Sequence, residues 1–255
     1  MNKFSVIIPA RLNSSRLPYK MTLDIGGEPL IVKTAKQALK SNASNVVVAT
    51  DHEDILNACK KHNIQAILTS ANHASGTDRL AEATQILNLN PHETIINVQG
   101  DEPLIDPNLI NELALFIQKQ QTEIATIAHP IYLEDEIFNP NVVKVVLDNS
   151  NHAMYFSRAA IPFYRNGYIE RSNFQLPPDL KILRHIGIYA YSVNFLNNYN
   201  KLAPCKLEQT ESLEQLRAMY YGYKISVLIT NSSPEAGVDT PEDLVRVRMT
   251  LNKKQ

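Results

Sequence analysis

The sequence predicts an α/β fold: a mixed, mostly parallel central sheet with helices on both faces and a smaller antiparallel lobe. First, short apolar runs alternate with helical patterns through the first half of the 255-residue chain. Second, these runs are apolar at consecutive positions, which is typical of parallel strands buried on both faces. Third, strand-like runs follow one another in the second half with little helix between them. This change of pattern predicts the antiparallel lobe.

The first half supplies the parallel part of the sheet. Its strand patterns cover residues 4–9, 45–50, 64–69 and 94–99, and its helix patterns cover residues 30–41, 53–62, 77–88 and 107–120. In the third helix pattern, Leu80, Ala83 and Leu87 recur at helical spacing. Because crossovers between parallel strands are right-handed, the loops that follow these strands are expected at one edge of the sheet.

The second half continues with strand patterns over 124–131, 142–148, 182–192 and 224–230, and with helix patterns over 207–221 and 241–251. The last helix has a clear start signal, because Thr240 can cap it and Pro241 fits the first helical position. The polar, proline-bearing stretch 163–180 is predicted to be a mobile loop or an insertion.

Composition excludes several classes of protein. The formal net charge is −1, so no basic surplus favours binding to DNA, RNA or an acidic membrane. Cys59 and Cys205 lack C-x-x-C spacing and are expected to be unpaired thiols in a reducing compartment. No apolar segment is long enough for a signal sequence or a membrane span. We therefore expect a cytoplasmic protein.

The segment PARLNSSRLPYK, which follows the first strand, carries a local cluster of positive charge. Arg11, Arg16 and Lys20 lie in it with no acidic residue among them. It matches neither the G-x-G-x-x-G turn nor the G-x-x-x-x-G-K-[ST] loop, so side chains must supply much of the anion binding. Two guanidinium groups and an ammonium can hold a triphosphate. The alternative is a solvated basic loop.

Two acidic segments, NVQGDEP and GVDTPEDL, are candidates for a metal site. Asp101 and Glu102 follow a strand end and a glycine, and Asp239 directly precedes the predicted cap Thr240. Carboxylates beside a phosphate site would repel the ligand unless a cation lay between them, and Mg²⁺ takes one or two carboxylates together with phosphates and water. Asp101 and Asp239 are thus a plausible metal pair. The alternative is a turn acid and an ordinary helix-start residue.

Three further patterns are weaker. Arg79 lies in the first turn of a helix, where a cation is unfavourable. This local cost indicates a specific role for Arg79. The alternative is an ordinary surface arginine. His185 and Tyr189 share one strand face. Such a pair is mildly suggestive of a site for a hydroxyl-rich ligand. The alternative is a hydrogen-bonded structural histidine. Glu214 and Gln215 lie in ESLEQLR, for which the helical pattern by itself favours a solvated face.

Taken together, nine segments in order resemble one known family. They are IIPARLNSSRLPYK, VVVATDHEDI, HASGTDRLAE, INVQGDEPLI, FNPNVVKVV, YFSRAAIP, RHIGIYAY, ESLEQLR and GVDTPEDLVRVR. The chain closely resembles the 3-deoxy-manno-octulosonate cytidylyltransferase family from about residue 4 to residue 249. The resemblance implies the nucleotide-diphospho-sugar transferase fold as a single domain over 1–255. It also implies a sugar-binding and dimerisation lobe at about 130–205.

The resemblance further implies an activity. Members transfer CMP from CTP to 3-deoxy-manno-octulosonate (Kdo) with Mg²⁺, release pyrophosphate, supply lipopolysaccharide synthesis and usually form homodimers. Three alternatives stay open: preference for 8-amino-Kdo, preference for another sugar acid such as sialic acid, and a non-catalytic nucleotide sensor. RHIGIYAY and ESLEQLR favour Kdo over sialic acid. The loop lysine and both carboxylates argue against the sensor.

The resemblance also implies roles for individual residues. The phosphates of CTP would be held by Arg11, Ser15 and Lys20. The cytidine pocket would be lined by Ala10, Ser75, Gly76 and Arg79. Mg²⁺ would bind Asp101 and Asp239, and catalysis would rest on Arg11, Lys20 and Asp101. The sugar acid would be surrounded by Gln99, Arg158, His185, Tyr189, Glu214 and Gln215.

One residue departs from the family pattern. Relatives usually have glycine directly before the loop lysine, where this chain has Tyr19. If that position requires a positive φ, tyrosine is strained there. The geometry of the phosphate loop is therefore the point at which this chain is expected to differ.

Overall fold

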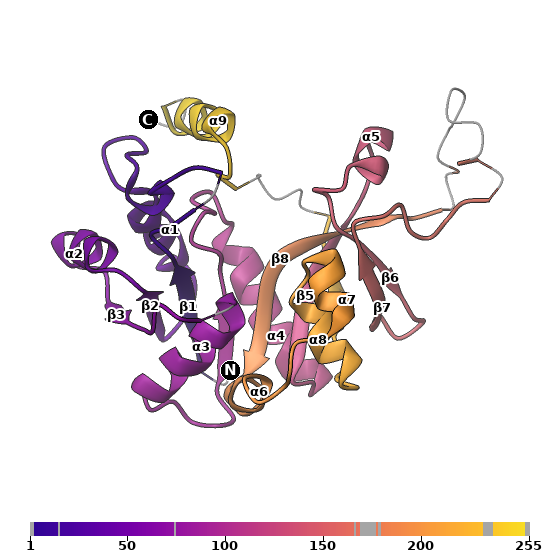
Figure 1. Cartoon of the computed structure of the whole chain (residues 1–255), viewed down its shortest axis with the longest axis horizontal. Helices are drawn as coiled ribbons and strands as arrows, with labels where there is room; N and C mark the ends of the chain where they lie inside the picture. The colour runs from indigo at the N-terminus through magenta and orange to yellow at the C-terminus, as the bar shows by residue number, and fades with distance from the viewer. Residues whose placement is uncertain are drawn as a thin grey trace.

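The computed structural model describes residues 3–14, 16–73, 75–165, 167–168, 177, 180–231 and 237–252. Within these residues, nine strands form one sheet whose main path runs in the order β3-β2-β1-β4-β8-β5-β9. Helices cover both faces of this sheet (Figure 1). The predicted α/β fold with a mixed, mostly parallel sheet is confirmed.

The first half matches its predicted elements closely. Its strands are β1 (Phe4–Ala10), β2 (Asn45–Thr50), β3 (Ala66–Leu68) and β4 (Thr94–Asn97). Its helices are α1 (Leu30–Ala38), α2 (Glu53–Lys61), α3 (Gly76–Ile86) and α4 (Pro107–Gln120). Strand β1 pairs in parallel with both β2 and β4, and β2 pairs in parallel with β3. The loops after these strands consequently meet at one edge of the sheet.

A single long strand reverses the sheet. Strand β8 (Leu183–Ser192) runs antiparallel to both β4 and β5 (Ile124–Pro130), and β9 (Ser226–Ile229) pairs in parallel with β5. The antiparallel pair β6 (Lys144–Leu147) and β7 (Ala153–Ser157) extends from the other end of β8 (Figure 1). The structure also contains elements that the sequence patterns did not predict. They are the 3₁₀ turn η1 (Lys20–Thr22), α5 (Glu134–Phe138), β7 and α6 (Val193–Tyr199).

The helix predicted over 207–221 is wrong as one element. The chain forms α7 (Lys206–Glu211) and α8 (Gln215–Tyr220), separated by Ser212 in the left-handed region at φ 52°. Neither glycine nor proline marks this break. The loop between the two helices turns Leu213 into the core and places Glu214 and Gln215 at a cavity wall.

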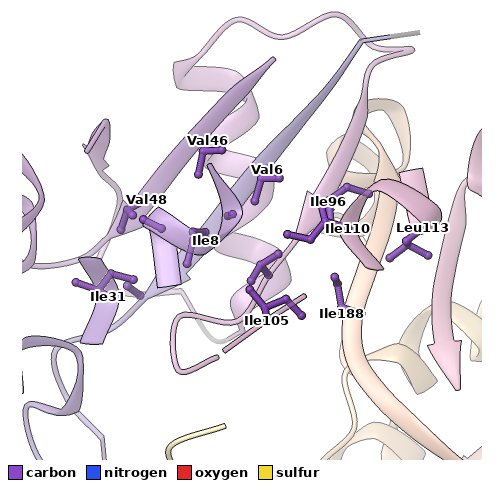
Figure 2. Close-up of a cluster of buried hydrophobic side chains, with 14 of the residues drawn as sticks. Val6, Ile8, Ile31, Val46, Val48, Ile96, Ile105, Ile110, Leu113 and Ile188 are labelled. Carbon is purple, nitrogen blue, oxygen red and sulfur yellow. The ribbon is translucent and has the colours of Figure 1, made fainter. Parts of the chain in front are cut away.

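Two apolar cores lie on opposite faces of the sheet, because successive side chains of each strand point to opposite faces. Val6 and Ile8 of β1 belong to one core, with α1, α2 and α4, and Figure 2 shows this cluster. Ile7, between them, belongs to the other core, with α3, α6 and α8. This double burial explains why the β1 sequence is apolar at consecutive positions.

The C-terminal helix α9 (Pro241–Asn252) begins as predicted. Thr240 Oγ1 accepts a hydrogen bond from the backbone N–H of Asp243 at 3.2 Å, and the Asp243 carboxylate accepts from the backbone N–H groups of Asp239 and Thr240. The Asp239 carboxylate is therefore not needed for capping and is available elsewhere.

The predicted loop at 163–180 lies largely outside the described residues. None of the helices in the described parts of the chain has the length and apolar character needed to cross a membrane.

Candidate active site

A cavity of about 660 Å³ opens where the loops after β1 and β4 face β8 and the connection between α7 and α8. Eleven predicted site residues line it: Arg11, Lys20, Gly76, Gln99, Asp101, Arg158, His185, Tyr189, Glu214, Gln215 and Asp239. Ala10, Ser75 and Arg79 lie in the described chain but do not line the cavity. Ser15 lies outside the described residues. The fold thus gathers residues from distant segments around one space.

Lys20 lies at the centre of a compact charged cluster. Its ammonium nitrogen Nζ donates to Asp101 Oδ2 at 2.5 Å, to Asp239 Oδ1 at 2.9 Å and to the backbone carbonyl of Val238 at 3.2 Å. The residue is 8% exposed. Burial by itself would lower the pKa of Lys20, but the two carboxylates outweigh it and raise that pKa above 10.5. Lys20 is therefore a cation throughout the physiological pH range.

Asp101 and Asp239 have the donor chemistry of a magnesium site. One oxygen of each lies within 3 Å of the same ammonium nitrogen, so two carboxylates converge on a position that a cation already fills. Hard divalent cations prefer such oxygen ligands. Among the described residues, no group of three or more His, Cys, Asp or Glu side chains could hold a metal ion. A Mg²⁺ ion between Asp101 and Asp239 would thus need further ligands from water and substrate phosphates.

Backbone packing sets the approach of these two acidic segments. The N–H of Val238 donates to the Asp101 carbonyl at 2.8 Å, and a Cβ atom added to Gly237 would lie 3.1 Å from the same oxygen. Glycine therefore permits the close contact that brings Asp239 beside Asp101. Arg16 adds an exposed ion pair to Asp239 at 3.1 Å. Arg16 thus lies in the predicted phosphate-binding loop and also links that loop to Asp239.

Arg11 differs from Lys20 in having an uncommitted charge. It lines the cavity, and its guanidinium makes no hydrogen bond or ion pair with any residue in the described part of the chain. A guanidinium that faces a cavity without a partner can receive a phosphate through forked N–H donors. Arg11 is consequently the loop cation best placed to meet an incoming anion.

Tyr19, directly before Lys20, adopts the left-handed conformation with φ 57° and ψ 20°. This is the position at which the family resemblance leads us to expect glycine. The ring is 58% exposed, so the strain is set by the backbone and not by side-chain packing. A residue with a Cβ atom pays about 1–2 kcal/mol in this conformation. The loop therefore holds Lys20 in place against a local conformational preference.

We expect Tyr19→Gly to raise the free energy of unfolding by about 0.5–1 kcal/mol. Relief of the left-handed strain exceeds the entropy that glycine adds to the unfolded chain. Urea denaturation measures the change. Tyr19→Ala is the matched control, because it removes the ring but keeps the Cβ atom and should give no gain. Equal stabilisation by both substitutions would show that the ring, and not the backbone angle, is responsible.

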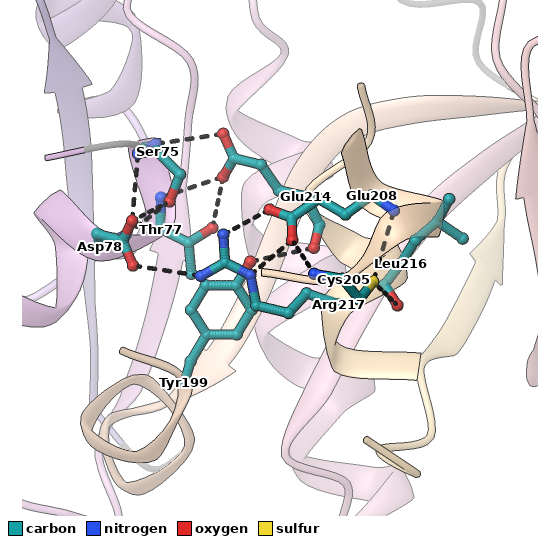
Figure 3. Close-up of polar contacts among 10 residues, drawn as sticks. Ser75, Thr77, Asp78, Tyr199, Cys205, Glu208, Glu214, Leu216 and Arg217 are labelled. Carbon is teal, nitrogen blue, oxygen red and sulfur yellow. Dashed lines mark hydrogen bonds and ion pairs between the residues drawn. The ribbon is translucent and has the colours of Figure 1, made fainter. Parts of the chain in front are cut away.

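The N-terminus of α3 is occupied by a carboxylate from the loop between α7 and α8. Glu214 accepts hydrogen bonds from the backbone N–H groups of Gly76 at 3.2 Å and Thr77 at 3.3 Å, and from Thr77 Oγ1 at 2.9 Å. Ser75 caps the same helix reciprocally with Asp78 (Figure 3). Glu214 thus joins the segment predicted to bind the sugar acid to the segment predicted to bind cytidine.

Behind Glu214 lies a buried ionic network that Figure 3 shows. The Arg217 guanidinium donates to Glu208 at 2.7 and 2.5 Å, lies 3.8 Å from Asp78, and covers the ring of Tyr199 at 4.8 Å. Tyr199 in turn donates to the Glu214 carbonyl at 3.0 Å. Arg217 is 5% exposed, so the solvated-face interpretation of ESLEQLR is wrong at this residue.

Arg79 is completely buried, so its interpretation as a plain surface arginine is also wrong. Its guanidinium donates to Thr69 Oγ1 at 2.5 Å, to the Ser70 carbonyl at 3.3 Å and to Asp51 at 3.1 Å. These partners follow β2 and β3, and the Asp51 carboxylate also accepts from the N–H of Leu12 in the phosphate loop. The arrangement favours a positioning role for Arg79 over direct contact with a ligand.

The opposite wall of the cavity combines residues of β4, β8 and the start of α8, and it contains polar groups with unused hydrogen-bonding capacity. Within the described residues, Asn97 Oδ1, Tyr189 Oη and Gln215 Nε2 are buried without a hydrogen-bond partner. All three residues line the cavity, so this wall is polar. His185 lies beside them and shares a 3.0 Å hydrogen bond with Thr126 Oγ1.

Burial lowers the pKa of His185 to about 3. We expect its ring to stay neutral from pH 8 to pH 5 in long-range ¹H–¹⁵N spectra. The unfolded chain binds a proton on this histidine near pH 6.5, whereas the native state does not. Stability should therefore fall as pH drops below about 6.5, by at most about 1.4 kcal/mol per pH unit from this group. His185→Gln should flatten that slope, and a ring that titrates near 6.5 would contradict the expectation.

Arg158 reaches the cavity from the end of β7 and is fixed by backbone carbonyls. Its guanidinium donates to the carbonyls of Glu211 at 2.7 Å, Pro140 at 2.9 Å and Ser212 at 3.4 Å. The Glu211 carboxylate accepts from the Arg158 backbone N–H at 2.9 Å. The Arg158 guanidinium therefore has no carboxylate partner among the described residues, which leaves it available to a negatively charged ligand.

Sequence patterns missed several residues of the cavity wall. Asn13, Thr77, Asn97 and Tyr191 all line it. Asn97 had a signal, because it is a polar residue inside the apolar run TIIN of β4. Tyr191 extends the alternation of His185 and Tyr189 along β8. Asn13 and Thr77 are ordinary loop and helix-start residues, and only the tertiary structure brings them to the cavity.

An α/β sheet with a basic loop and two converging carboxylates at the carboxyl ends of its strands is the arrangement of a nucleotide-binding enzyme. A family model described as cytidylyltransferase matches residues 5–225. The 3-deoxy-manno-octulosonate cytidylyltransferase of Neisseria meningitidis serogroup C (strain 053442) is 52% identical over 248 residues, which are 97% of this chain and 98% of that relative. The enzyme of that name from Herminiimonas arsenicoxydans is 54% identical over 245 residues, or 96% and 97% of the two chains.

A solved structure agrees with these relatives. CMP:2-keto-3-deoxy-manno-octonic acid synthetase complexed with CTP superimposes on this chain with a TM-score of 0.89 at 38% identity, and the match covers 100% of both chains. The chain belongs to the 3-deoxy-manno-octulosonate cytidylyltransferase family.

Proposed function

We propose that the chain transfers CMP from CTP to Kdo and releases pyrophosphate. The observation that carries this proposal is the two-sided cavity of about 660 Å³. One wall presents Arg11 and the Lys20 cluster, which suit a nucleotide triphosphate. The other presents Arg158, His185 and the polar side chains of Asn97, Tyr189 and Gln215, which suit a polyhydroxylated acid. Family membership supplies the identity of the two substrates.

In the proposed reaction, the anomeric hydroxyl oxygen of Kdo attacks the α-phosphorus of CTP. A phosphorus–oxygen bond to the sugar forms, the bond from the α-phosphorus to the oxygen bridging to the β-phosphate breaks with pyrophosphate as the leaving group, and the hydroxyl proton passes to solvent water. No protein nucleophile is required. Catalysis then consists mainly of alignment and electrostatic stabilisation. Arg11 would bind phosphate oxygens, and Arg158 would bind the sugar-acid carboxylate.

The residues present fit Mg²⁺, because Asp101 and Asp239 direct one oxygen each to a single cation position. We therefore include Mg²⁺, held by these two carboxylates, as the cofactor. When bound, it would offset phosphate charge and favour the ionised form of the attacking hydroxyl. Lys20 and Ser15 are proposed phosphate ligands on the basis of the family resemblance.

On the nucleotide side, Gly76 is proposed to lie against cytidine. Ser75 and Arg79 would position the start of α3, and Ala10 is the last residue of β1. Neither Ala10 nor Arg79 has more than 1% of its surface exposed, so we assign them to positioning. Gln99, Tyr189, Glu214 and Gln215 complete the proposed sugar side.

A homodimer, a cytoplasmic location and a role in lipopolysaccharide synthesis belong to the same proposal. The resemblance supports all three, and exposed apolar residues support the first. Tyr132, Leu133 and Phe163 are 70%, 68% and 66% exposed and lie within the predicted lobe at 130–205. Sedimentation velocity should give about twice the chain mass of 28.7 kDa. A species of single-chain mass at micromolar concentration would remove the dimer from the proposal.

A pyrophosphate-release assay tests the function directly. With CTP and Mg²⁺, we expect release with Kdo and little or none with sialic acid. Addition of 8-amino-Kdo decides between the two octulosonate substrates, and UTP in place of CTP tests the choice of base. If no sugar acid gives release while CTP still binds, the chain is a nucleotide sensor and not an enzyme.

A further inference from the structure

The Lys20 ammonium is fully committed in the free protein. An ammonium group has three N–H donors, and Lys20 has three acceptors within hydrogen-bond distance: Asp101 Oδ2, Asp239 Oδ1 and the Val238 carbonyl. With 8% exposure, the side chain has little access to other partners. Lys20 therefore has no donor left for a phosphate in this conformation.

The same ammonium fills the position between the two proposed metal ligands. A divalent cation that bound Asp101 Oδ2 and Asp239 Oδ1 would lie within a few ångströms of Nζ. Two cations so close repel strongly in a partly buried site, where screening by water is weak. Lys20 in its present position and a metal ion between these carboxylates consequently exclude each other.

Lys20 lies in a loop with local backbone strain. Lys20 begins the short turn η1 directly after Tyr19, whose left-handed conformation is unfavourable for a residue other than glycine. Arg11 faces the same cavity with an uncommitted guanidinium. A triphosphate could therefore bind first to Arg11 and then offer Lys20 anionic acceptors in exchange for the two carboxylates.

We propose that Lys20 is an internal counter-ion that keeps divalent metal away from Asp101 and Asp239 until the phosphates of the nucleotide draw its ammonium aside. The inference rests on the proposed function, since it assumes that these carboxylates bind the metal. It makes metal binding conditional on nucleotide. By thermodynamic linkage, the metal must strengthen nucleotide binding by the same factor. Lys20 is then a positioning residue for the metal as well as a phosphate ligand.

Mn²⁺ binding, measured by electron paramagnetic resonance on the whole chain without nucleotide, tests the proposal. We expect wild-type protein to bind Mn²⁺ weakly, and Lys20→Met to bind it at least about tenfold more tightly. Lys60→Met is the matched control, because it removes the same charge from an exposed position on α2 and should leave the affinity unchanged. Adding Asp101→Asn to Lys20→Met should abolish the gain and thereby locate the ion.

A second measurement uses only wild-type protein, in case Lys20→Met folds poorly. In ¹³C,¹⁵N-labelled protein, the Lys20 side-chain signals should be unchanged by Mg²⁺ alone and should shift when CTP is added with Mg²⁺. Wild-type affinity for Mn²⁺ equal to that of Lys20→Met, or a Lys20 shift with Mg²⁺ alone, would overturn the counter-ion role and leave the metal site intact. Absence of Mn²⁺ binding by wild type and variant alike, even with CTP, would overturn the metal site and the proposed cofactor with it.

Discussion

Asp101→Asn is expected to lower turnover by at least about a hundredfold, on the scale of losing one key electrostatic group. Asp101 provides the shorter of the two carboxylate contacts to Lys20, at 2.5 Å, and is proposed to bind Mg²⁺ with Asp239. The amide keeps the size of the side chain but removes its charge. Both the metal and the lysine then lose half of their negative partners. Initial rates of pyrophosphate release at saturating CTP and Kdo measure the effect.

Asp106→Asn is the matched control for this substitution. Asp106 lies on the same loop and caps α4 by accepting from the N–H of Asn108 at 2.9 Å. Asparagine caps helices about as well as aspartate, so activity and stability should be nearly unchanged. If Asp101→Asn turns over at a near-normal rate in saturating Mg²⁺, Asp101 is not a metal ligand.

Arg217→Met is expected to lower the free energy of unfolding by about 3–5 kcal/mol, the usual cost of leaving one charge of a buried ion pair without its partner. Glu208, 9% exposed, would lose the two short hydrogen bonds from the guanidinium. The pKa of Arg217 is raised, chiefly by its hydrogen bonds to Glu208, which identifies the charged pair as the native form. Urea denaturation at pH 7 measures the loss, and the double variant Glu208→Met/Arg217→Met checks its cause.

The double variant should recover much of the stability lost by Arg217→Met, because two apolar side chains leave no buried charge without a partner. A loss in the double variant equal to the sum of the two single losses would mean that the pair does not act as a unit. A measurement of the KM for Kdo tests whether the pair also supports the active site. Tyr199 and the Arg217 network support Glu214, so a folded double variant is expected to have a raised KM for Kdo.

Local sequence patterns predicted most of the fold because burial on both faces of a sheet leaves a direct trace in the residues. The run at β1 is apolar throughout since Val6 and Ile8 enter one core while Ile7 enters the other. The cap of α9 was also predictable, because Thr240 acts on a neighbour only three residues away. The break at Ser212 left no such trace, because a serine is compatible with both a continuous helix and a turn.

For the charged residues, the sequence predicted their positions along the chain but not their partners. The sequence determined that cations follow β1 and that carboxylates follow β4 and precede α9, because these are positions along the chain. Only the tertiary structure decided that Lys20 faces Asp101 and Asp239, which lie 81 and 219 positions away. It also decided that Arg79 and Arg217 are buried. The physical reason is that a charge is stabilised by whatever partner the packed fold brings within a few ångströms, and helical or strand periodicity contains no record of that partner.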